Sequence, residues 1–308
     1  MTPERIICIG DLHGDFEVFI KVLYMCKLID SNSSWIGNKT HVVQLGDILD
    51  GKRPGISPDK NFLNITGEVE LIKYINLLDV QARRVGGRVI SILGNHELYP
   101  FYLGRDKKFI KDYVKKSDIA KFKESFGIER HSFLKPGGIG GAFFGRTRPL
   151  ILQYGKFLFV HGSVTDSLIK NNIGKDGFVD IKKINHETSK WLQGKGKVPV
   201  YLKHLDDENP VGSRAYSHSR HIGKDSCKKV NEQLGFFKRA NYVVMGHSSY
   251  KHVNTACDGT LIRTDVALSR AFGGKISDKK IQALEIINPG TKPKISIISE
   301  NGTTILNE

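Results

Sequence analysis

Asp11 and His13 stand two residues apart in the segment Gly-Asp-Leu-His-Gly, directly after a short apolar run. In an extended chain, side chains at this spacing point to the same side. A carboxylate and an imidazole could therefore bind one metal ion together, and the flanking glycines allow the backbone to bend closely around it. The chemistry that this pair predicts is metal binding.

Further potential ligands follow other apolar runs in the same way. Asp47 follows the second run, Asn95 the third, His161 the fourth and His247 the fifth. Each of them alone is more often a turn former or a structural residue, so the prediction depends on their shared position at the ends of the runs. Together with the first pair, they offer enough oxygen and imidazole ligands for two divalent metal ions that share Asp47 as a bridge.

The apolar runs that must position these side chains have the composition of buried strands. They are rich in β-branched residues and cover residues 5–9, 40–45, 88–93, 157–160 and 242–245. Helical patterns lie between the early runs, at residues 16–23 and 69–78, and Gly86-Gly87 ends the second of them. Strands that alternate with helices predict an α/β fold with the polar loops gathered at the ends of the strands.

Two longer segments separate the later runs. Residues 100–150 combine charged helices with a glycine-rich stretch at 137–141, which lacks the Gly-Lys-Ser/Thr ending of a P-loop and is interpreted as a flexible connection. Residues 165–240 are predicted to be a second helical insertion, with 225–239 as its clearest helix. Beyond residue 260 short strands return, and Asn301-Gly302 predicts a hairpin turn. We expect one domain over residues 1–308 with these two insertions.

Composition limits the class of protein. Hydrophobic residues make up 39% of the 308 residues and charged residues 26%, which are ordinary globular values. No apolar stretch approaches the roughly 18 residues of a membrane span, and the first residues lack the pattern of a secretory signal. The sequence therefore predicts a soluble, cytoplasmic protein that does not associate with membranes.

The chain carries a net charge of +15. Nearly all of this surplus lies in residues 105–148 and 168–239. It is either a solvated lysine-rich surface or a positive rim that attracts an anionic substrate, such as a phosphorylated protein or nucleic acid.

The four cysteines, Cys8, Cys26, Cys227 and Cys257, include no Cys-x-x-Cys pair. This spacing argues against a structural zinc site or a redox pair, and we expect reduced, mostly buried thiols. The histidines outside the strand-end motifs are interpreted as exposed or structural, although the segment 218–221 could border the site; they are His41, His131, His186, His204, His218, His221 and His252.

The strand-end motifs resemble, in order, those of the calcineurin-like metallophosphoesterase superfamily. They read Gly-Asp-Leu-His-Gly, Gly-Asp-Ile-Leu-Asp, Gly-Asn-His-Glu, His-Gly and Gly-His. Gly-Asn-His-Glu, with Asp15 in the first motif, resembles the phosphoprotein phosphatase branch. The insertions and the segment 209–216, Asn-Pro-Val-Gly-Ser-Arg-Ala-Tyr, are most similar to its Shewanella-like phosphatases. The resemblance implies a central β-sandwich flanked by helices, in α-β-β-α layers.

The resemblance also implies the metal ligands. They would be Asp11, His13 and Asp47 for one ion, and Asp47, Asn95, His161 and His247 for the other. The ions would be manganese, iron or zinc, because His, Asp and Asn ligands suit all three. A water bound between them would attack a phosphomonoester directly, since metal ions lower its pKa far below the value of about 15.7 in bulk water.

Catalytic and phosphate-binding residues follow from the same resemblance. His96 would be the general acid that protonates the leaving group, and Asp50 would accept a hydrogen bond from His96 and fix its ring. Arg214 would bind the substrate phosphate through two hydrogen bonds, with Asn95 beside it.

One position departs from the family pattern, which continues after the second aspartate as Arg-Gly. This chain has Asp50-Gly51-Lys52-Arg53 there. Arg53 could replace the missing arginine as a phosphate ligand, and so could Lys52, although lysine does not provide a bidentate fork; both could equally be exposed loop charges. Asp265 resembles the closing motif of the family and is interpreted as a supporting or structural residue.

The function implied by the resemblance is a serine/threonine protein phosphatase that acts on phosphorylated proteins, with phosphotyrosine as a further substrate of this branch. A phosphatase or pyrophosphatase for nucleotides or nucleic-acid ends is an alternative, because it would use the same metal core. A non-catalytic basic scaffold that binds nucleic acid is a second alternative, against which the complete set of ligands argues.

Overall fold

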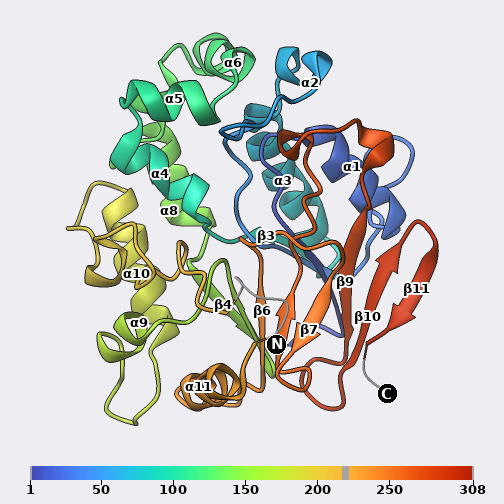
Figure 1. Cartoon of the computed structure of the whole chain (residues 1–308), viewed down its shortest axis with the longest axis vertical. Coiled ribbons are helices and arrows are strands. Elements are labelled where there is room, and N and C mark those ends of the chain that lie inside the picture. The colour runs from blue at the N-terminus through green and yellow to red at the C-terminus, as the bar shows by residue number, and fades with distance from the viewer. Residues whose placement is uncertain (1, 217–221, 307–308) are drawn as a thin grey trace.

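The computed structural model describes residues 2–216 and 222–306, and its strands form two sheets (Figure 1). The first sheet has six strands in the order β11-β10-β9-β1-β2-β3, and the second has five in the order β4-β5-β6-β8-β7. The strands are β1 (Arg5–Ile9), β2 (His41–Gln44), β3 (Arg88–Ser91), β4 (Ile151–Tyr154), β5 (Phe157–Val160), β6 (Tyr242–Met245), β7 (Asn254–Ala256), β8 (Leu261–Arg263), β9 (Gln282–Ile287), β10 (Lys294–Ser299) and β11 (Gly302–Ile305).

Each sheet has a parallel centre. In the first sheet β1 pairs with β2 and β2 with β3, and in the second β5 pairs with β6 and β6 with β8. Residues 6–9 of β1 are fully buried, so both faces of this strand are covered. Because the carboxyl ends of parallel strands meet at one edge of a sheet, the loops after β1, β2 and β3 leave from the same edge.

Helices lie on the outside of the sheets (Figure 1). The α-helix α3 packs against β3 and α1, whereas α10 packs against β4 and α8. This arrangement confirms the predicted α/β fold with helices around two sheets. The α-helices are α1 (Phe16–Met25), α2 (Lys60–Asn64), α3 (Glu68–Arg83), α4 (Asn95–Leu103), α5 (Lys107–Tyr113), α6 (Lys116–Phe126), α7 (Arg130–Phe133), α8 (Ile139–Thr147), α9 (Asp166–Lys170), α10 (Ile181–Leu192) and α11 (Lys224–Leu234). Three short 3₁₀ helices are η1 (Val200–Leu202), η2 (Arg270–Phe272) and η3 (Ile276–Asp278).

The helices between the strands fall into two groups. Helices α4 to α8 lie between β3 and β4, and α9 to α11 lie between β5 and β6. These are the segments in which the sequence predicts helical insertions; the assignment of residues 1–308 to one domain stays a prediction. In the part of the chain that the structure describes, no helix combines the length and the apolar character needed to cross a membrane.

The interpretation of residues 137–141 as a flexible connection is wrong, because α8 begins at Ile139 within this stretch. Its glycines permit close packing. A Cβ atom on Gly140 would lie 2.2 Å from the Phe133 ring, and one on Gly141 would lie 2.3 Å from the carbonyl oxygen of Lys135. The glycines therefore serve helix packing.

Two other predicted elements have different outcomes. The helix predicted at 225–239 is shorter than expected, since α11 ends at Leu234. After this end the backbone N–H of Phe237 donates to the Leu234 carbonyl oxygen at 2.8 Å, and the Phe237 side chain is buried. The predicted hairpin is confirmed, since β10 and β11 pair in antiparallel fashion with Ser299 opposite Gly302.

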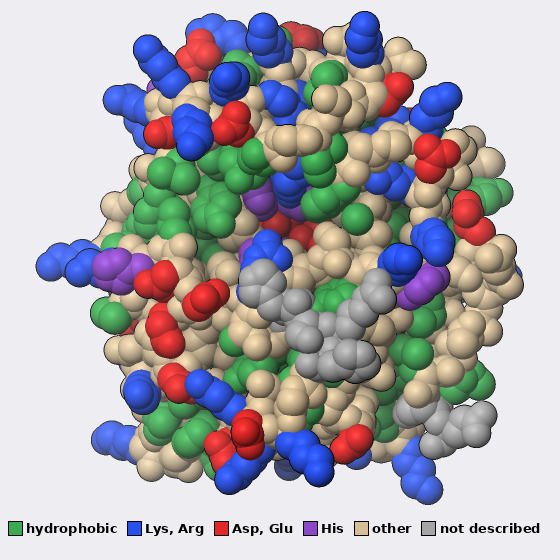
Figure 2. Space-filling model, in the orientation of Figure 1, with side chains coloured by type: hydrophobic (Ala, Val, Ile, Leu, Met, Phe, Trp, Pro, Cys, Tyr) green, Lys and Arg blue, Asp and Glu red, His purple; other side chains and the backbone are tan. Residues whose placement is uncertain are grey.

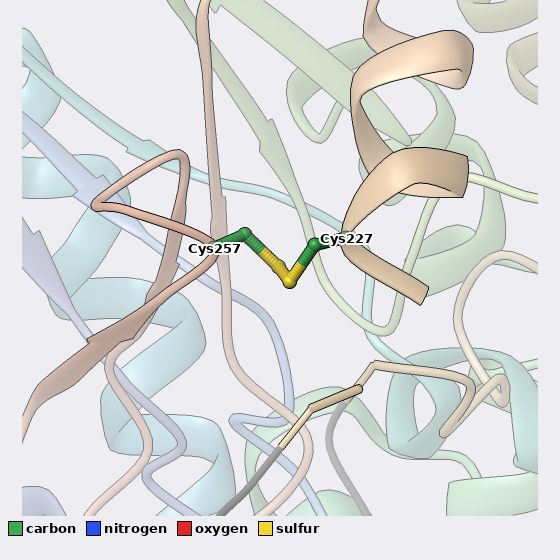
Figure 3. The surroundings of a disulfide bond; sticks show 2 residues. All are labelled: Cys227 and Cys257. Atoms are coloured by element: carbon green, nitrogen blue, oxygen red, sulfur yellow. A yellow bond between two sulfur atoms is a disulfide. The ribbon is translucent and has the colours of Figure 1, made fainter. Parts of the chain in front are cut away.

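The expectation of four reduced thiols is also wrong. Cys227 in α11 and Cys257 after β7 form a disulfide (Figure 3), whereas Cys8 and Cys26 are free and buried. The spacing rule missed this bond because its partners are 30 residues apart and meet only after α11 lies beside the second sheet.

Candidate metal centre

Loops from both sheets bring the six predicted ligands into one buried cluster. Asp47 lies at its centre, with its Oδ2 atom 3.7 Å from His13 Nε2 and its Oδ1 atom 3.3 Å from His161 Nε2. Exposure ranges from 0 to 7% among Asp11, His13, Asp47, Asn95, His161 and His247. Side chains separated by up to 236 residues thus share one site.

Backbone carbonyl groups orient two of the imidazoles. His13 Nδ1 lies 3.0 Å from the carbonyl oxygen of Leu49, and His161 Nδ1 lies 2.6 Å from that of Leu45. A carbonyl only accepts hydrogen bonds, so each of these Nδ1 atoms carries a hydrogen, and Nε2 is the atom that can bind a metal ion when it is deprotonated. Both Nε2 atoms face Asp47. Histidines that bind metal ions are commonly oriented in this way.

The remaining ligands complete the cluster. The His247 N–H donates to Asp11 Oδ1 at 3.2 Å, and Asp11 Oδ2 lies 3.8 Å from His13 Nε2. Asn95 Oδ1 lies 2.9 Å from His161 Nε2. These contacts place an aspartate beside His13 and an amide beside His161, and a ring nitrogen of His247 lies within 4.8 Å of the ligand atoms of Asp47 and His161.

The loops around the centre are tightly bent. Positive φ angles of 42, 56, 63 and 67° occur at His13, Asp47, Asp50 and His247. Non-glycine residues adopt this region rarely, and they concentrate at functional sites. A Cβ atom on Gly94 would lie only 2.3 Å from Asp47 Oδ1, and one on Gly246 only 2.5 Å from Asp11 Oδ1. The glycines of the motifs therefore let neighbouring loops approach the carboxylates.

The charges in this cluster favour the binding of a cation. Burial, Asp265 and Asp47 raise the pKa of Asp11 well above its usual range. Burial also opposes ionisation of Asp47, but His161 and His96 outweigh it and hold the pKa of Asp47 well below its usual range. Burial would lower the pKa of His161, yet Asp47 and Asp11 raise it to about 10. The carboxylates thus retain positive charge on the nearest imidazole, and divalent metal ions fit this donor set.

Two groups of side chains have the geometry of a cation site. Ligand atoms of His13, Asp47 and His96 lie within 4.8 Å of one another, and so do those of Asp47, His161 and His247. Asp47 belongs to both groups, as expected for a carboxylate that bridges two ions. The first group includes His96, which the sequence assigns to proton transfer instead.

His96 lies in the first turn of α4 and contacts the predicted partner. Its Nδ1 atom is 2.8 Å from Asp50 Oδ2, and its Nε2 atom is 3.9 Å from Asp47 Oδ2. Two aromatic rings surround it, with centroid distances of 5.1 Å to Tyr99 and 5.5 Å to Tyr113. The ring therefore faces the centre with Nε2 and the protein interior with Nδ1.

The two candidates for the missing arginine lie in different surroundings. The Arg53 guanidinium contacts both ring nitrogens of His13 and donates to the carbonyl oxygen of Asp50 at 2.9 Å. The Lys52 ammonium instead reaches the carbonyl oxygen of Lys111. The structure thus brings Arg53 to the metal centre and turns Lys52 toward α5.

Arg214 and Asp265 also lie beside the centre. Arg214 Nη1 donates to the carbonyl oxygen of His247 at 3.2 Å and to Ser248 Oγ at 2.6 Å. Asp265 is buried and accepts a hydrogen bond from Ser249 Oγ at 2.6 Å. Arg214 is therefore held on the loop that carries a predicted ligand, and Asp265 supports the same loop.

Sequence reasoning assigned no role to Glu97, although it is part of the third motif. Glu97 Oε2 accepts hydrogen bonds from the backbone N–H groups of Asp47 at 2.7 Å and Gly94 at 2.8 Å, and Oε1 accepts from Ile48 at 2.8 Å. It therefore fastens the second strand-end loop to the third. Its position in the first turn of α4, directly after His96, was the available signal.

Among the described residues, the histidines outside the motifs take no part in these two groups. His41 and His131 are half-buried, and His186, His204 and His252 are exposed. His218 and His221 lie outside the described residues.

The centre lies at the floor of a surface hollow. Figure 2 shows histidine, acidic and basic side chains at this floor, near the middle of the face. Hydrophobic side chains gather beside it over α4 and α8, and lysine and arginine side chains surround α5 and α6. A ligand entering the hollow would therefore meet an apolar surface on one side and a basic one on another.

Comparison with protein families gives one match over most of the chain. The model for calcineurin-like phosphoesterases matches residues 4–250. Among curated proteins, Shewanella-like protein phosphatase 2 of Arabidopsis thaliana is 27% identical, over 87% of this chain and 72% of its own length. Shewanella-like protein phosphatase 1 of Plasmodium berghei is 28% identical, over 92% of this chain and 74% of its own length.

Solved structures share the fold. The cold-active protein-tyrosine phosphatase of a psychrophilic Shewanella species has a TM-score of 0.72 at 20% identity, and the match covers 99% of this chain and 81% of that one. A protein serine/threonine phosphatase from Saccharomyces cerevisiae has a TM-score of 0.53 at 13% identity, covering 96% and 80%. The two-sheet architecture therefore recurs in both.

Proposed function

The chain belongs to the calcineurin-like phosphoesterase family, and from this premise we propose that it is a metal-dependent protein phosphatase. The observation that carries the proposal is the meeting of three imidazoles, one further carboxylate and one amide around Asp47. The names of the Arabidopsis and Plasmodium relatives support phosphoproteins as the substrates.

Two divalent ions, of manganese, iron or zinc, would bind at this centre. When bound, they supply positive charge for the phosphoryl oxygens and make a coordinated water acidic enough to react near neutral pH. The residues that would hold them are Asp11, His13 and Asp47 for one ion, and Asp47, Asn95, His161 and His247 for the other.

His96 would deliver the proton to the leaving-group oxygen. Its Nδ1 atom faces the Asp50 carboxylate at 2.8 Å, and a carboxylate accepts hydrogen bonds, so Nδ1 donates there. The proton that can be transferred is then the one on Nε2, the atom that faces the centre. Asp50 would keep the ring in this orientation and stabilise its protonated form.

Arg214 and Arg53 would bind the phosphate, with Asn95 beside them. Arg214 is anchored at the carbonyl oxygen of His247, and Arg53 lies against His13, so both guanidinium groups border the predicted ligands. A guanidinium pairs with phosphate oxygens through two parallel hydrogen bonds. The basic surface over α5 and α6 would attract anionic substrates in general, and it favours nucleotides or nucleic-acid ends as a second candidate class.

A substrate panel after metal removal tests the proposal. The protein is stripped with a chelator, each metal is restored in turn, and kcat/KM is measured on phosphoserine, phosphothreonine and phosphotyrosine peptides, nucleotides and 3′- or 5′-phosphorylated oligonucleotides. We expect hydrolysis to stop on chelation, to return with metal, and to be fastest on phosphopeptides.

Two results would contradict it. A preference above about 100-fold for nucleotides would move the chain to the second class. No hydrolysis with any metal, together with nucleic-acid binding that falls steeply with salt, would indicate a binding scaffold. The predicted cytoplasmic location is tested separately, by fractionation of cells that make the chain.

A further inference from the structure

Arg130 is a buried cation with no role in the chemistry proposed above. It is the first residue of α7 and is 6% exposed. Its Nη2 atom lies 2.7 Å from Asp50 Oδ1, and its Nε atom lies 2.6 Å from Glu68 Oε2. One guanidinium thus joins two carboxylates, both of which are fully buried.

Asp50 divides its two oxygens between Arg130 and His96. Oδ1 accepts from Arg130, and Oδ2 accepts from His96 Nδ1 at 2.8 Å. The backbone N–H of Asp50 donates to Glu68 Oε1 at 2.9 Å. Arg130 and Glu68 therefore fix the side chain and the backbone of Asp50, a residue held at a φ of 63°.

A second ion pair supports this arrangement from α6. Asp118 Oδ1 accepts from the N–H groups of Gly67 at 2.8 Å and Glu68 at 3.1 Å, and its Oδ2 lies 3.3 Å from Lys115 Nζ. Both side chains are fully buried. We call the five residues Asp50, Glu68, Lys115, Asp118 and Arg130 the Arg130 cluster. Three of them come from the segment between β3 and β4.

The chemistry of a guanidinium suits this position. It is planar, and its N–H groups point in fixed directions, so it can bind two carboxylates at once, which an ammonium group does less well. Burial would lower the pKa of Arg130, but Glu68 and Asp50 outweigh burial and raise it. The side chain therefore stays charged and keeps both contacts.

We propose that Arg130 is a positioning residue that acts through Asp50 to aim the His96 ring at the leaving-group oxygen. This inference rests on the proposed function, because it presupposes proton donation by His96. If Arg130 only stabilised the fold, its loss would affect all substrates alike. If it positions the proton donor, its loss affects most the substrates whose leaving group needs a proton.

The test compares two substrates. The p-nitrophenolate leaving group departs without much help from an acid, whereas the serine alkoxide of a phosphoserine peptide needs a proton. For Arg130→Met, we expect kcat on the phosphoserine peptide to fall about 10–100-fold, less than the about 10²–10⁴-fold range expected for His96→Ala. On p-nitrophenyl phosphate kcat should fall by less than about 3-fold, and KM should stay similar on both.

Three further variants serve as controls. Arg130→Lys keeps the positive charge but lacks the forked guanidinium, so it should regain part of the phosphoserine activity that Arg130→Met loses. It also replaces Arg130→Met in the test if that variant does not fold. Glu68→Gln weakens the same positioning from the backbone side, because Glu68 accepts from the Asp50 N–H, so it should slow the phosphoserine peptide more than p-nitrophenyl phosphate. Arg88→Met breaks an ion pair with Asp79 at the opposite end of β3 from His96 and should change stability without changing kcat.

A double variant separates the mechanisms. If Arg130 acts through Asp50, adding Arg130→Met to Asp50→Asn should slow phosphoserine hydrolysis little further, since the two losses are not additive. Equal losses on both substrates, or full additivity with Asp50→Asn, would overturn the inference. An inactive wild type would instead contradict the proposed function. If the wild type is active and only His96→Ala, not Arg130→Met, loses more activity on the phosphoserine peptide than on p-nitrophenyl phosphate, the role of Arg130 is contradicted. The proposed function is then unaffected.

Discussion

The metal centre and the Arg130 cluster treat buried charge in opposite ways. At the centre, Asp47 and Asp11 form no ion pair with a lysine or arginine among the described residues, and they raise the pKa of His161 to about 10. In the Arg130 cluster, Glu68 and Asp118 each have a cationic partner, at 2.6 and 3.3 Å.

This difference in pairing distinguishes the cluster proposed to bind a ligand from the cluster that holds it in place. A buried charge costs free energy unless it is paired. Each carboxylate of the Arg130 cluster contacts a cationic side chain of the protein, whereas at the proposed metal centre a bound ion would supply the positive charge. Buried carboxylates without a lysine or arginine partner therefore indicate where a cation binds, and carboxylates that have such a partner indicate what holds the site in place.

Replacement of Asp47 gives the largest expected effect, because this carboxylate belongs to both cation groups. Asp47→Asn should lower kcat by more than the about 10²–10⁴-fold expected for loss of a general acid, and it should lower bound metal in elemental analysis. Asp79→Asn, which breaks an ion pair with Arg88 elsewhere in the first sheet, is the control. Full metal content and full turnover in Asp47→Asn would remove the distinction between the two clusters.

Arg214→Lys asks whether an arginine outside both clusters acts on the phosphate. A hydrogen bond to a charged group contributes about 1.5–3 kcal/mol, so loss of the fork should lower kcat/KM about 10–100-fold. Lys52→Met is the matched control, since its ammonium group is turned toward Lys111, and it should leave kcat/KM unchanged. Equal effects of the two variants would show that Arg214 contributes only charge.

The pH dependence of metal binding tests whether the carboxylates of the centre hold a proton on His161. In the metal-free protein His161 keeps its proton up to pH about 10, and it must lose that proton to bind a metal ion. Burial lowers the pKa of His13 and His247, so these two rings add no proton in this range. Asp11, whose pKa is raised by burial, Asp265 and Asp47, must also be ionised to bind, so apparent metal affinity should rise at least about tenfold for each pH unit between pH 7 and 9.

Calorimetry in buffers of different protonation enthalpy would measure the protons released. We expect at least one proton to be released per metal-binding event that involves His161, and one proton fewer in His161→Gln. Affinity that does not change between pH 7 and 9 would contradict the charge balance described for the centre.

The sequence predicts these six potential ligands because each of them stands in a local pattern; their role as metal ligands stays a prediction. Asp11, Asp47 and His161 all follow a short apolar strand, and parallel strands bring their carboxyl ends together whatever lies between them. The same reasoning is weaker for helices, whose ends depend on packing. It placed a flexible connection where α8 begins, because glycine also allows close contact between helices.

The strand-end motifs predicted an α/β fold and six potential ligands, and the family they resemble implied the two-layer sandwich and the contact between Asp50 and His96. Only the tertiary structure decided that Arg53 rather than Lys52 reaches the centre, that Glu97 binds the second loop, and that Arg130 holds Asp50 from 80 residues away. The physical reason is that a strand end fixes the direction of a nearby side chain, whereas pairing between distant charges depends on how the intervening helices pack.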